Sequence, residues 1–166
     1  LSLKCYALGG GIKASSVEVD YSKDPFRSGL QLEVASGSVY SKNWSKLKSG
    51  FKLHSVNVKL EKYWERRYLA NFEYLKKLIE NSNPYLDHIL NELEKRNMPT
   101  ELSLLPMIES GYDSKALSKS KAAGLWQFTR GTGKYKNLTQ SHYVDERLNL
   151  QNSTDAALDY LEELYE

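Results

Sequence analysis

The stretch Glu101-Leu-Ser-Leu-Leu-Pro-Met-Ile-Glu109-Ser110 decides the fold, because it places a carboxylate where an otherwise apolar helix ends. Leu102, Leu104, Leu105 and Ile108 have helical spacing, and Thr100 after Pro99 is the predicted N-cap. Packed leucines disfavour the charged carboxylate, and the protonated form is the one that a general acid needs. Glu109 is therefore the candidate catalytic residue, and the alternative is a solvated Glu just beyond a core helix.

Further motifs extend from this stretch in both directions. A small-residue turn and the run Ala123-Gly124-Leu125-Trp126-Gln127-Phe128 follow it, and Gly131-Thr-Gly133 comes next. The other motifs are Trp44 through Phe51, Asn83-Pro-Tyr-Leu86, Arg96-Asn-Met-Pro99, Tyr143-Val-Asp-Glu-Arg147 and Ser153-Thr-Asp-Ala-Ala-Leu158. In this order and spacing, most of the chain resembles the catalytic domain of the lytic transglycosylases.

The resemblance implies a mainly α chain, with a helical platform followed by the N-terminal half of a lysozyme-like domain. It implies that Glu109 cleaves the β-1,4 bond between N-acetylmuramic acid and N-acetylglucosamine in peptidoglycan glycan strands, without a cofactor, leaving a 1,6-anhydro sugar. Ser110 would orient the acid, and the substrate-binding residues would be Ser110, Gly124, Leu125, Trp126 and Gln127. The alternative for Trp126 is an aromatic residue that lines the core. Tyr112 could likewise belong to the core or to the cleft.

Composition, pattern and the resemblance divide the chain into four segments. Residues 1–7 resemble the tail of a signal peptide, with a lipid anchor at Cys5 as the alternative, and residues 8–43 form a Gly- and Ser-rich extension. Residues 44–98 form the helical platform, and residues 99–166 form the partial catalytic domain. We therefore expect an exported protein of the periplasm or cell envelope, with peripheral membrane association and outer-membrane anchoring left open, as is the oligomeric state.

Helical periods predict the elements of the platform. We expect one helix around Val56 to Tyr68, a second from Phe72 to Ile79, and a third from Leu86 to Leu93 that Asn83-Pro84 opens. Leu30 to Val34 could be a strand. Near the site, the patterns predict a short helix around Leu125 to Phe128, a loop through Gly131 and Gly133, and a last helix from 153 to 165 capped by Ser153 or Thr154.

Charge and composition exclude several classes of function. Lys plus Arg number 23 against 21 Asp plus Glu, so the chain lacks the basic field typical of nucleic-acid binding. His54, His88 and His142 are scattered without ligand spacing, which argues against a metal site. Gly111 is predicted to end the Glu109 helix, which favours a structural or loop-capping role for Asp113 over the alternative of a second catalytic carboxylate. Asp145 and Arg147 form the expected ion pair that braces the following loop.

The family carries an Ala-Tyr-Asn motif, further cleft residues and closing helices that would follow Glu166. We therefore expect these 166 residues alone to leave apolar surface uncovered and to have impaired activity. Two alternatives to a lytic transglycosylase stay open: a goose-type lysozyme-like hydrolase of the same polymer, and a non-catalytic remnant that binds murein.

Overall fold

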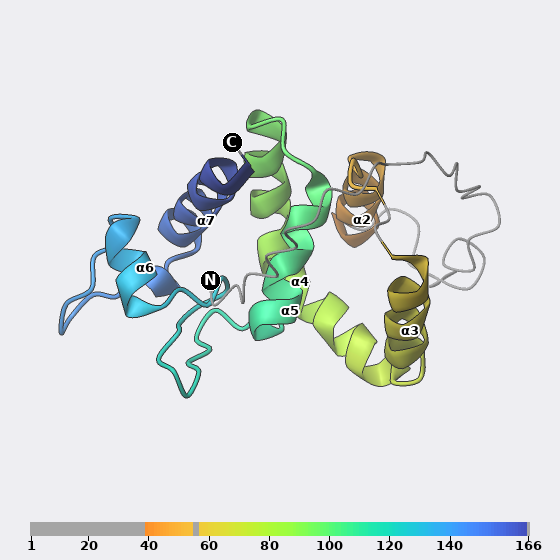
Figure 1. Cartoon of the computed structure of the whole chain (residues 1–166), viewed down its shortest axis with the longest axis horizontal. Helices are drawn as coiled ribbons and strands as arrows, with labels where there is room; N and C mark the ends of the chain where they lie inside the picture. Colours follow the sequence, from red (N-terminus) through yellow and green to blue (C-terminus); the bar gives the residue numbers. More distant parts are fainter. Residues whose placement is uncertain (1–38, 55–56, 166) are drawn as a thin grey trace.

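The computed structural model describes residues 39–54 and 57–165, and these form helices joined by turns and isolated β-bridges. The elements are α2 (Val39–Ser49), α3 (Val58–Leu69), α4 (Phe72–Lys95), η2 (Thr100–Leu104), α5 (Leu105–Ser110), α6 (Arg130–Tyr135), η3 (Glu146–Leu148) and α7 (Leu150–Tyr165). Figure 1 shows α4 through the middle, with α2 and α3 on one side and α6 and α7 on the other. The mainly α prediction is confirmed.

Several predictions fall outside the described residues. These are the signal-peptide tail 1–7, the strand around Leu30 to Val34, and Val56 at the start of the first platform helix. Within the described part, α2 already begins at Val39, inside the segment 8–43 that we predicted as an extension.

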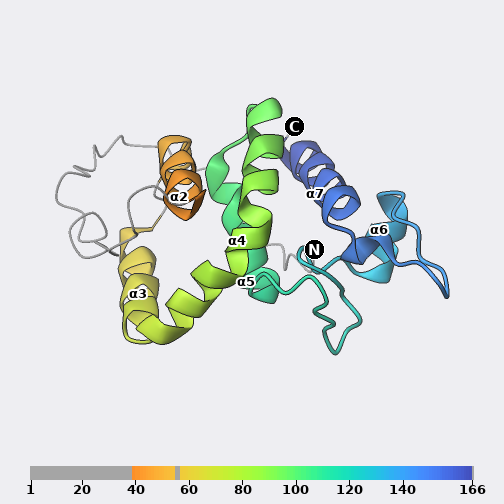
Figure 2. The ribbon, with the colours of Figure 1, turned by 180° about the vertical axis from the view of Figure 1, so that it is seen from behind.

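Helix α4 is continuous, which corrects the prediction of two helices separated at Asn83-Pro84. Its buried residues recur every three or four positions from Leu75 to Leu93, so one apolar stripe runs through both predicted helices. Pro84 cannot donate a backbone hydrogen bond, and its ring disturbs the preceding turn, which bends a helix without necessarily ending it. Figures 1 and 2 show α4 bent between the half beside α3 and the half beside α7.

The second half of α4 packs into the main core. Its Ile89 and Leu93 are fully buried against residues of the later loops and of α7, namely Tyr112, Leu125, Trp126, Phe128, Leu138, Ala156, Ala157 and Leu158. A second cluster joins Leu86 and Leu90 to Leu47 of α2. Each such side chain contributes about 2 kcal/mol when removed from water, so α4 holds α2 and the loops around the site in one body.

Helix α3 leaves most of its apolar side chains exposed. Asn57 caps it by accepting a hydrogen bond from the backbone of Leu60, but α3 has no buried residue. Leu60, Tyr63 and Trp64 stay about half exposed. The helix is therefore held by its cap and a light contact with α4 and adds little to the core.

The segment that carries Glu109 begins as a 3-10 helix and continues as α5. Thr100 is not its N-cap, because the Thr100 hydroxyl donates to the carbonyl of Leu47 in α2 instead. Ile108 is 72% exposed, which corrects the prediction of a buried face at this position. Gly111 ends α5 with a left-handed φ of 62°, as predicted.

Three predictions near the site are wrong. Residues 124–127 form a turn between the bridged residues Ala123 and Phe128. Residues 130–135 form α6, which Thr129 caps through the backbone of Thr132. Helix α7 begins at Leu150, and the side chain of Asn149 accepts from the backbone of Asn152 in its first turn. Ser153 and Thr154 are buried within α7 rather than capping it.

Gly124 gives a test of this packing. It has φ +78°, and a Cβ built there would lie 2.0 Å from the carbonyl oxygen of Arg147. We expect Gly124→Ala to reduce the free energy of unfolding by at least about 2 kcal/mol, because strain and a backbone clash add. Chemical denaturation measures the loss.

The control is Gly131→Ala in α6. There the nearest atom to an added Cβ is the Thr129 hydroxyl oxygen at 4.0 Å, and alanine favours a helix. Equal stability of the two variants would contradict the close approach at Gly124.

Candidate functional site

An open hollow of about 560 Å³ surrounds the end of α5. One wall comes from the first half of α4, another from residues 107–111 of α5 and its cap, and the third from the loop after it. The lining residues are Tyr74, Lys77, Leu78, Asn81, Met107, Ile108, Glu109, Ser110, Gly111, Asp113, Ala116, Leu117, Ser118 and Gln127. The hollow therefore holds three of the predicted site residues: Glu109, Ser110 and Gln127.

Glu109 lies in the last turn of α5, half-buried, beside the left-handed Gly111. The side chain of Asn81 donates to the Gly111 carbonyl over 3.0 Å, which fixes the end of α5 against α4. Within the part of the chain that the structure describes, the Glu109 carboxylate makes no hydrogen bond or ion pair. Its oxygens are therefore available to a ligand in the hollow.

Ser110 ties α5 to the following loop. Its hydroxyl lies 3.1 Å from the Pro106 carbonyl and 2.9 Å from the Leu125 carbonyl, both of which are acceptors. The Ser110 hydroxyl therefore donates its hydrogen within the protein. This geometry suits a role in which Ser110 holds the backbone and so positions the neighbouring Glu109.

Gln127 joins the same loop from the other side. Its backbone has φ 48°, and its side-chain nitrogen donates to the carbonyl of Gly124 over 2.8 Å and lies 3.3 Å from that of Ala116. The side chain is almost fully buried yet lines the hollow. A contact between Gln127 and a sugar stays a prediction.

Leu125 and Trp126 lie behind the hollow. Both side chains lie in the core, and the Trp126 ring is completely buried, with its Nε1 donating to the Thr154 hydroxyl of α7 over 3.1 Å. Neither side chain lines the hollow, so their burial does not support the predicted sugar contacts. Their place in the structure is to anchor the loop that carries Gln127 to α7.

Gly124 also lies behind the hollow. Its missing Cβ leaves room for the carbonyl of Arg147, not for a ligand. The predicted close backbone approach is therefore present, but its partner is within the protein, and Gly124 is not among the residues that line the hollow.

Arg147 holds this loop together. It is 2% exposed, and its guanidinium makes two hydrogen bonds with Asp145, at 2.9 and 2.6 Å. It also donates to the carbonyls of Lys121 and Phe128, at 2.9 and 3.0 Å. The predicted ion pair is thus present, but it braces the preceding loop 121–128 rather than the following one, a role that sequence spacing did not reveal.

Asp113 and Tyr112, which lie near Glu109 in the sequence, make hydrogen bonds within the protein. The Asp113 carboxylate accepts from the backbone of Lys115 over 2.8 Å, which is the predicted loop cap. Tyr112 is a core residue, stacked on Tyr85, with its hydroxyl donating to the carbonyl of Ser103. Burial raises the pKa of the Tyr112 hydroxyl above its usual range, so it stays neutral.

Sequence reasoning missed the contribution of α4 to the hollow. Tyr74, Lys77 and Asn81 line it, but the prediction of a new helix at Asn83-Pro84 hid the fact that this face continues into the core helix. The signal was present in the positions 74, 77, 78 and 81, which share one helix face.

The comparisons with known proteins agree with this geometry. Residues 88–166 match the family described as "Transglycosylase SLT domain". Over this segment the chain is similar to the lytic transglycosylases. The transglycosylase match contains Glu109 and the loop to Gln127, but not Tyr74, Lys77 or Asn81.

Two relatives of the transglycosylase segment are similar over more than half of this chain. "Membrane-bound lytic murein transglycosylase D" of Escherichia coli (strain K12) is 40% identical over 100 residues, which are 60% of this chain and 22% of that protein. A protein of Alteromonas sp. (strain M-1), named for tributyltin chloride resistance, is 41% identical over 98 residues, 59% of this chain and 46% of that protein. The chain thus spans less than half the length of either relative.

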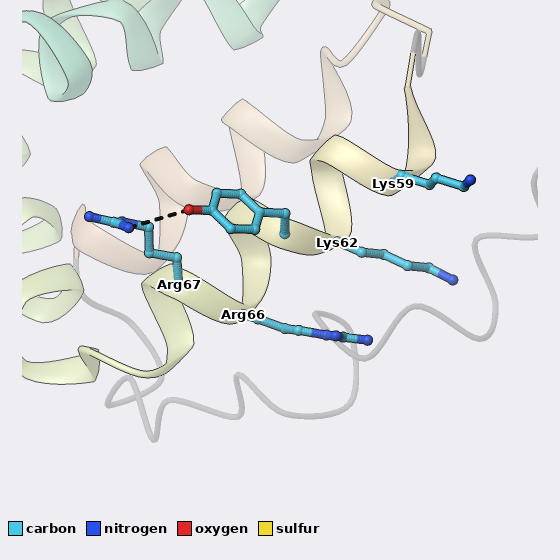
Figure 3. A pocket seen from close by; sticks show the side chains of 5 residues that line it. Lys59, Lys62, Arg66 and Arg67 are labelled. Atoms are coloured by element: carbon cyan, nitrogen blue, oxygen red, sulfur yellow. Dashed lines mark hydrogen bonds between the residues drawn. The ribbon is translucent and has the colours of Figure 1, made fainter.

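A second hollow of about 520 Å³ lies on α3, away from the transglycosylase segment. Figure 3 shows Lys59, Lys62 and Arg66 extending to the same side, while Arg67 lies by the Tyr63 hydroxyl, its acceptor at 3.4 Å. The described residues that line it are four cations and a tyrosine, so they offer no carboxyl group like Glu109. In residues 39–54 and 57–165 no three His, Cys, Asp or Glu side chains cluster as metal ligands.

The Asp145–Arg147 pair predicts a pH dependence of stability. Hydrogen bonds from Arg147 hold the pKa of Asp145 below its usual range. The pair therefore contributes stability that is complete above the unfolded pKa, about 3.9, and is lost as the pH falls through the lower folded pKa. We expect Asp145→Asn to lose roughly 1–3 kcal/mol at pH 7 and to show a flatter acid decline than the parent.

Thermal unfolding between pH 7 and pH 2 tests this, with Glu94→Gln as the control. Glu94 pairs with Lys46 at 2.7 Å on the surface, where an ion pair adds little, so its loss should change the curve much less. Parallel pH curves for Asp145→Asn and the parent would show that the buried pair does not govern acid stability.

Proposed function

We propose that this chain carries the acid–base centre of a peptidoglycan lytic transglycosylase, with Glu109 as the single catalytic carboxyl group. The observation that carries the proposal is the position of Glu109: it lies in an open hollow at the end of α5, inside the segment that matches the transglycosylase family, with no internal partner among the described residues. Asp113 lines the same hollow, but its carboxylate caps a loop.

One carboxyl group suffices for the proposed reaction. Protonated Glu109 donates its proton to the oxygen that links N-acetylmuramic acid to N-acetylglucosamine, and the bond to the muramyl carbon breaks. The substrate's acetamido group stabilises the cationic centre, and the Glu109 carboxylate then accepts the proton of the C6 hydroxyl as that oxygen closes the 1,6-anhydro ring. Each step leaves the carboxyl group in the state that the next step needs, and no water is consumed.

The other site residues support this centre in different ways. Ser110 fixes the end of α5 through the Leu125 carbonyl, and Gln127 offers a polar wall where the acetamido group or a sugar hydroxyl would lie. Gly124, Leu125 and Trp126 pack inside the protein and hold the loop in place. The segments 44–98 and 99–166 remain our proposed platform and catalytic part, although the family match begins earlier, at His88.

Replacement of the carboxyl group tests the mechanism. We expect Glu109→Gln, made in the whole natural protein, to lower the release of anhydro-muropeptides from murein sacculi at least about 100-fold, because the amide keeps the shape but cannot cycle a proton. Binding to the sacculi should persist. Liquid chromatography with mass spectrometry measures the products.

The matched control is Asp113→Asn, which changes the neighbouring carboxylate in the same hollow and should keep most of the activity. Turnover of Glu109→Gln within tenfold of the parent would eliminate Glu109 as the acid. Products with a reducing end instead of an anhydro end would favour the lysozyme-like hydrolase, which the comparisons do not support.

We also propose that the protein acts in the bacterial cell envelope, where its polymer lies, and that it is exported. One relative is named as membrane-bound. Among the described residues, none of the helices has both the length and the apolar character to cross a bilayer. The lipid anchor at Cys5 and the oligomeric state remain alternatives for experiment.

If the signal-peptide interpretation holds, the exported protein begins at Leu8. Mass spectrometry of the N-terminal peptide from the envelope fraction measures this. A diacylglyceryl group on Cys5 would support the lipid anchor instead, and recovery only from the cytoplasm would refute export.

A further inference from the structure

The first half of α4 forms a wall of the Glu109 hollow that the transglycosylase match does not include. Tyr74, Lys77, Leu78 and Asn81 share one helix face and line the hollow together. Asn81 binds the Gly111 carbonyl, and a Cβ added to Gly111 would lie only 3.2 Å from the Leu78 side chain. The hydrogen bond fixes the wall against the helix end that carries Glu109, and Leu78 lies close beside Gly111.

Tyr74 and Lys77 continue this wall beyond the packed contact. Tyr74 is 50% exposed, and Lys77 is exposed. In residues 39–54 and 57–165, neither makes a hydrogen bond, an ion pair or a ring contact. Their side chains therefore contribute little that the fold requires, although they face the same space as the candidate catalytic residue.

The chemistry of the two side chains fits a particular unit of the polymer. An aromatic ring packs on the apolar face of a sugar, and an ammonium group pairs with a carboxylate. The other charged residues that line the hollow in the described chain are Glu109 and Asp113, so Lys77 is its cation. In murein, the muramyl sugar alone carries a peptide, and that peptide bears carboxylates.

We propose that the first half of α4 recognises the peptide-bearing sugar, with Tyr74 packing on the ring and Lys77 pairing with a carboxylate of the peptide stem. The inference rests on the proposed function, because it names a recognition element of that same site. Tyr74 and Lys77 are three positions apart, about 4.5 Å along the helix axis, so one sugar and the first part of its peptide can contact both.

Binding measured without turnover tests the inference. In the Glu109→Gln background of the whole natural protein, each variant is titrated against two soluble glycan preparations: strands with their peptides, and strands from which an amidase has removed the peptides. We expect Lys77→Met to weaken binding to the peptide-bearing strands at least fivefold and to leave binding to the peptide-free strands unchanged. Lys77→Arg should restore most of the loss.

Tyr74→Ala should weaken binding to both preparations, whereas Tyr74→Phe should bind like the parent, since the ring and not the hydroxyl makes the contact. The matched controls are Lys76→Met, an exposed lysine next in the chain that does not line the hollow, and Tyr143→Ala, which is 91% exposed elsewhere. Thermal unfolding checks that each variant is folded.

The outcomes separate this inference from the proposed function. If the parent releases anhydro-muropeptides but the Lys77 and Tyr74 variants bind both preparations normally, only the α4 wall is refuted. An equal loss for Lys77→Met on both preparations, or a loss shared by Lys76→Met, would indicate general charge attraction and overturn the peptide contact. If the parent neither binds nor cleaves murein, the proposed function and this inference fail together.

Discussion

The site depends on the hydrogen bonds that the buried guanidinium of Arg147 makes. A cation removed from water costs several kcal/mol unless charge and hydrogen bonds replace the solvent. Asp145 supplies the charge, and the carbonyls of Lys121 and Phe128 supply the remaining acceptors. The Arg147 carbonyl fills the space that Gly124 leaves open. Arg147 comes from a later segment and thus holds the loop 121–128 closed. The Leu125 carbonyl of this loop accepts a hydrogen bond from the Ser110 hydroxyl, and this bond steadies the end of α5.

Helix α4 connects this arrangement to the opposite wall of the hollow. Its second half is buried in the core, and its first half faces the hollow, so a single rigid element positions both. Pro84 lies inside α4 between the two halves, and a proline inside a helix commonly bends it. Had the chain formed two helices with a break at Asn83, the wall and the core could shift independently, and the contact of Asn81 with Gly111 would have to hold them alone.

Local sequence patterns predicted the features whose causes are local. The end of α5 at Gly111 follows from glycine's access to positive φ, and the Asp113 cap and the Asp145–Arg147 pair follow from short spacing. Features fixed by distant partners were predicted wrongly. Threonine is a common N-cap residue, but the hydroxyl of Thr100 donates to the carbonyl of Leu47 instead.

The two glycines of α6 illustrate the same limit. They suggested a loop, because glycine weakens a helix. A Cβ at Gly133 would lie 2.8 Å from the Gln140 side-chain nitrogen and 3.0 Å from Cδ of Arg147, so close packing accounts for glycine there rather than a turn. The spacing of Tyr74 and Lys77 shows that they share a helix face, but not that this face lines the hollow, since that depends on how α4 lies against α5.

Several residues in and behind the hollow hold a positive φ, which bears on how the site works. They are Gly111, Tyr112, Lys121, Gly124 and Gln127, and Asn97 and Asn137 hold one elsewhere in the described chain. A residue other than glycine holds such a conformation only where its surroundings compensate for the cost of roughly 1–3 kcal/mol. The core holds Tyr112, and the amide of Gln127 is bound to the Gly124 carbonyl. Because these contacts are all internal, the loop takes its shape before a ligand arrives, and binding energy is not spent on ordering it.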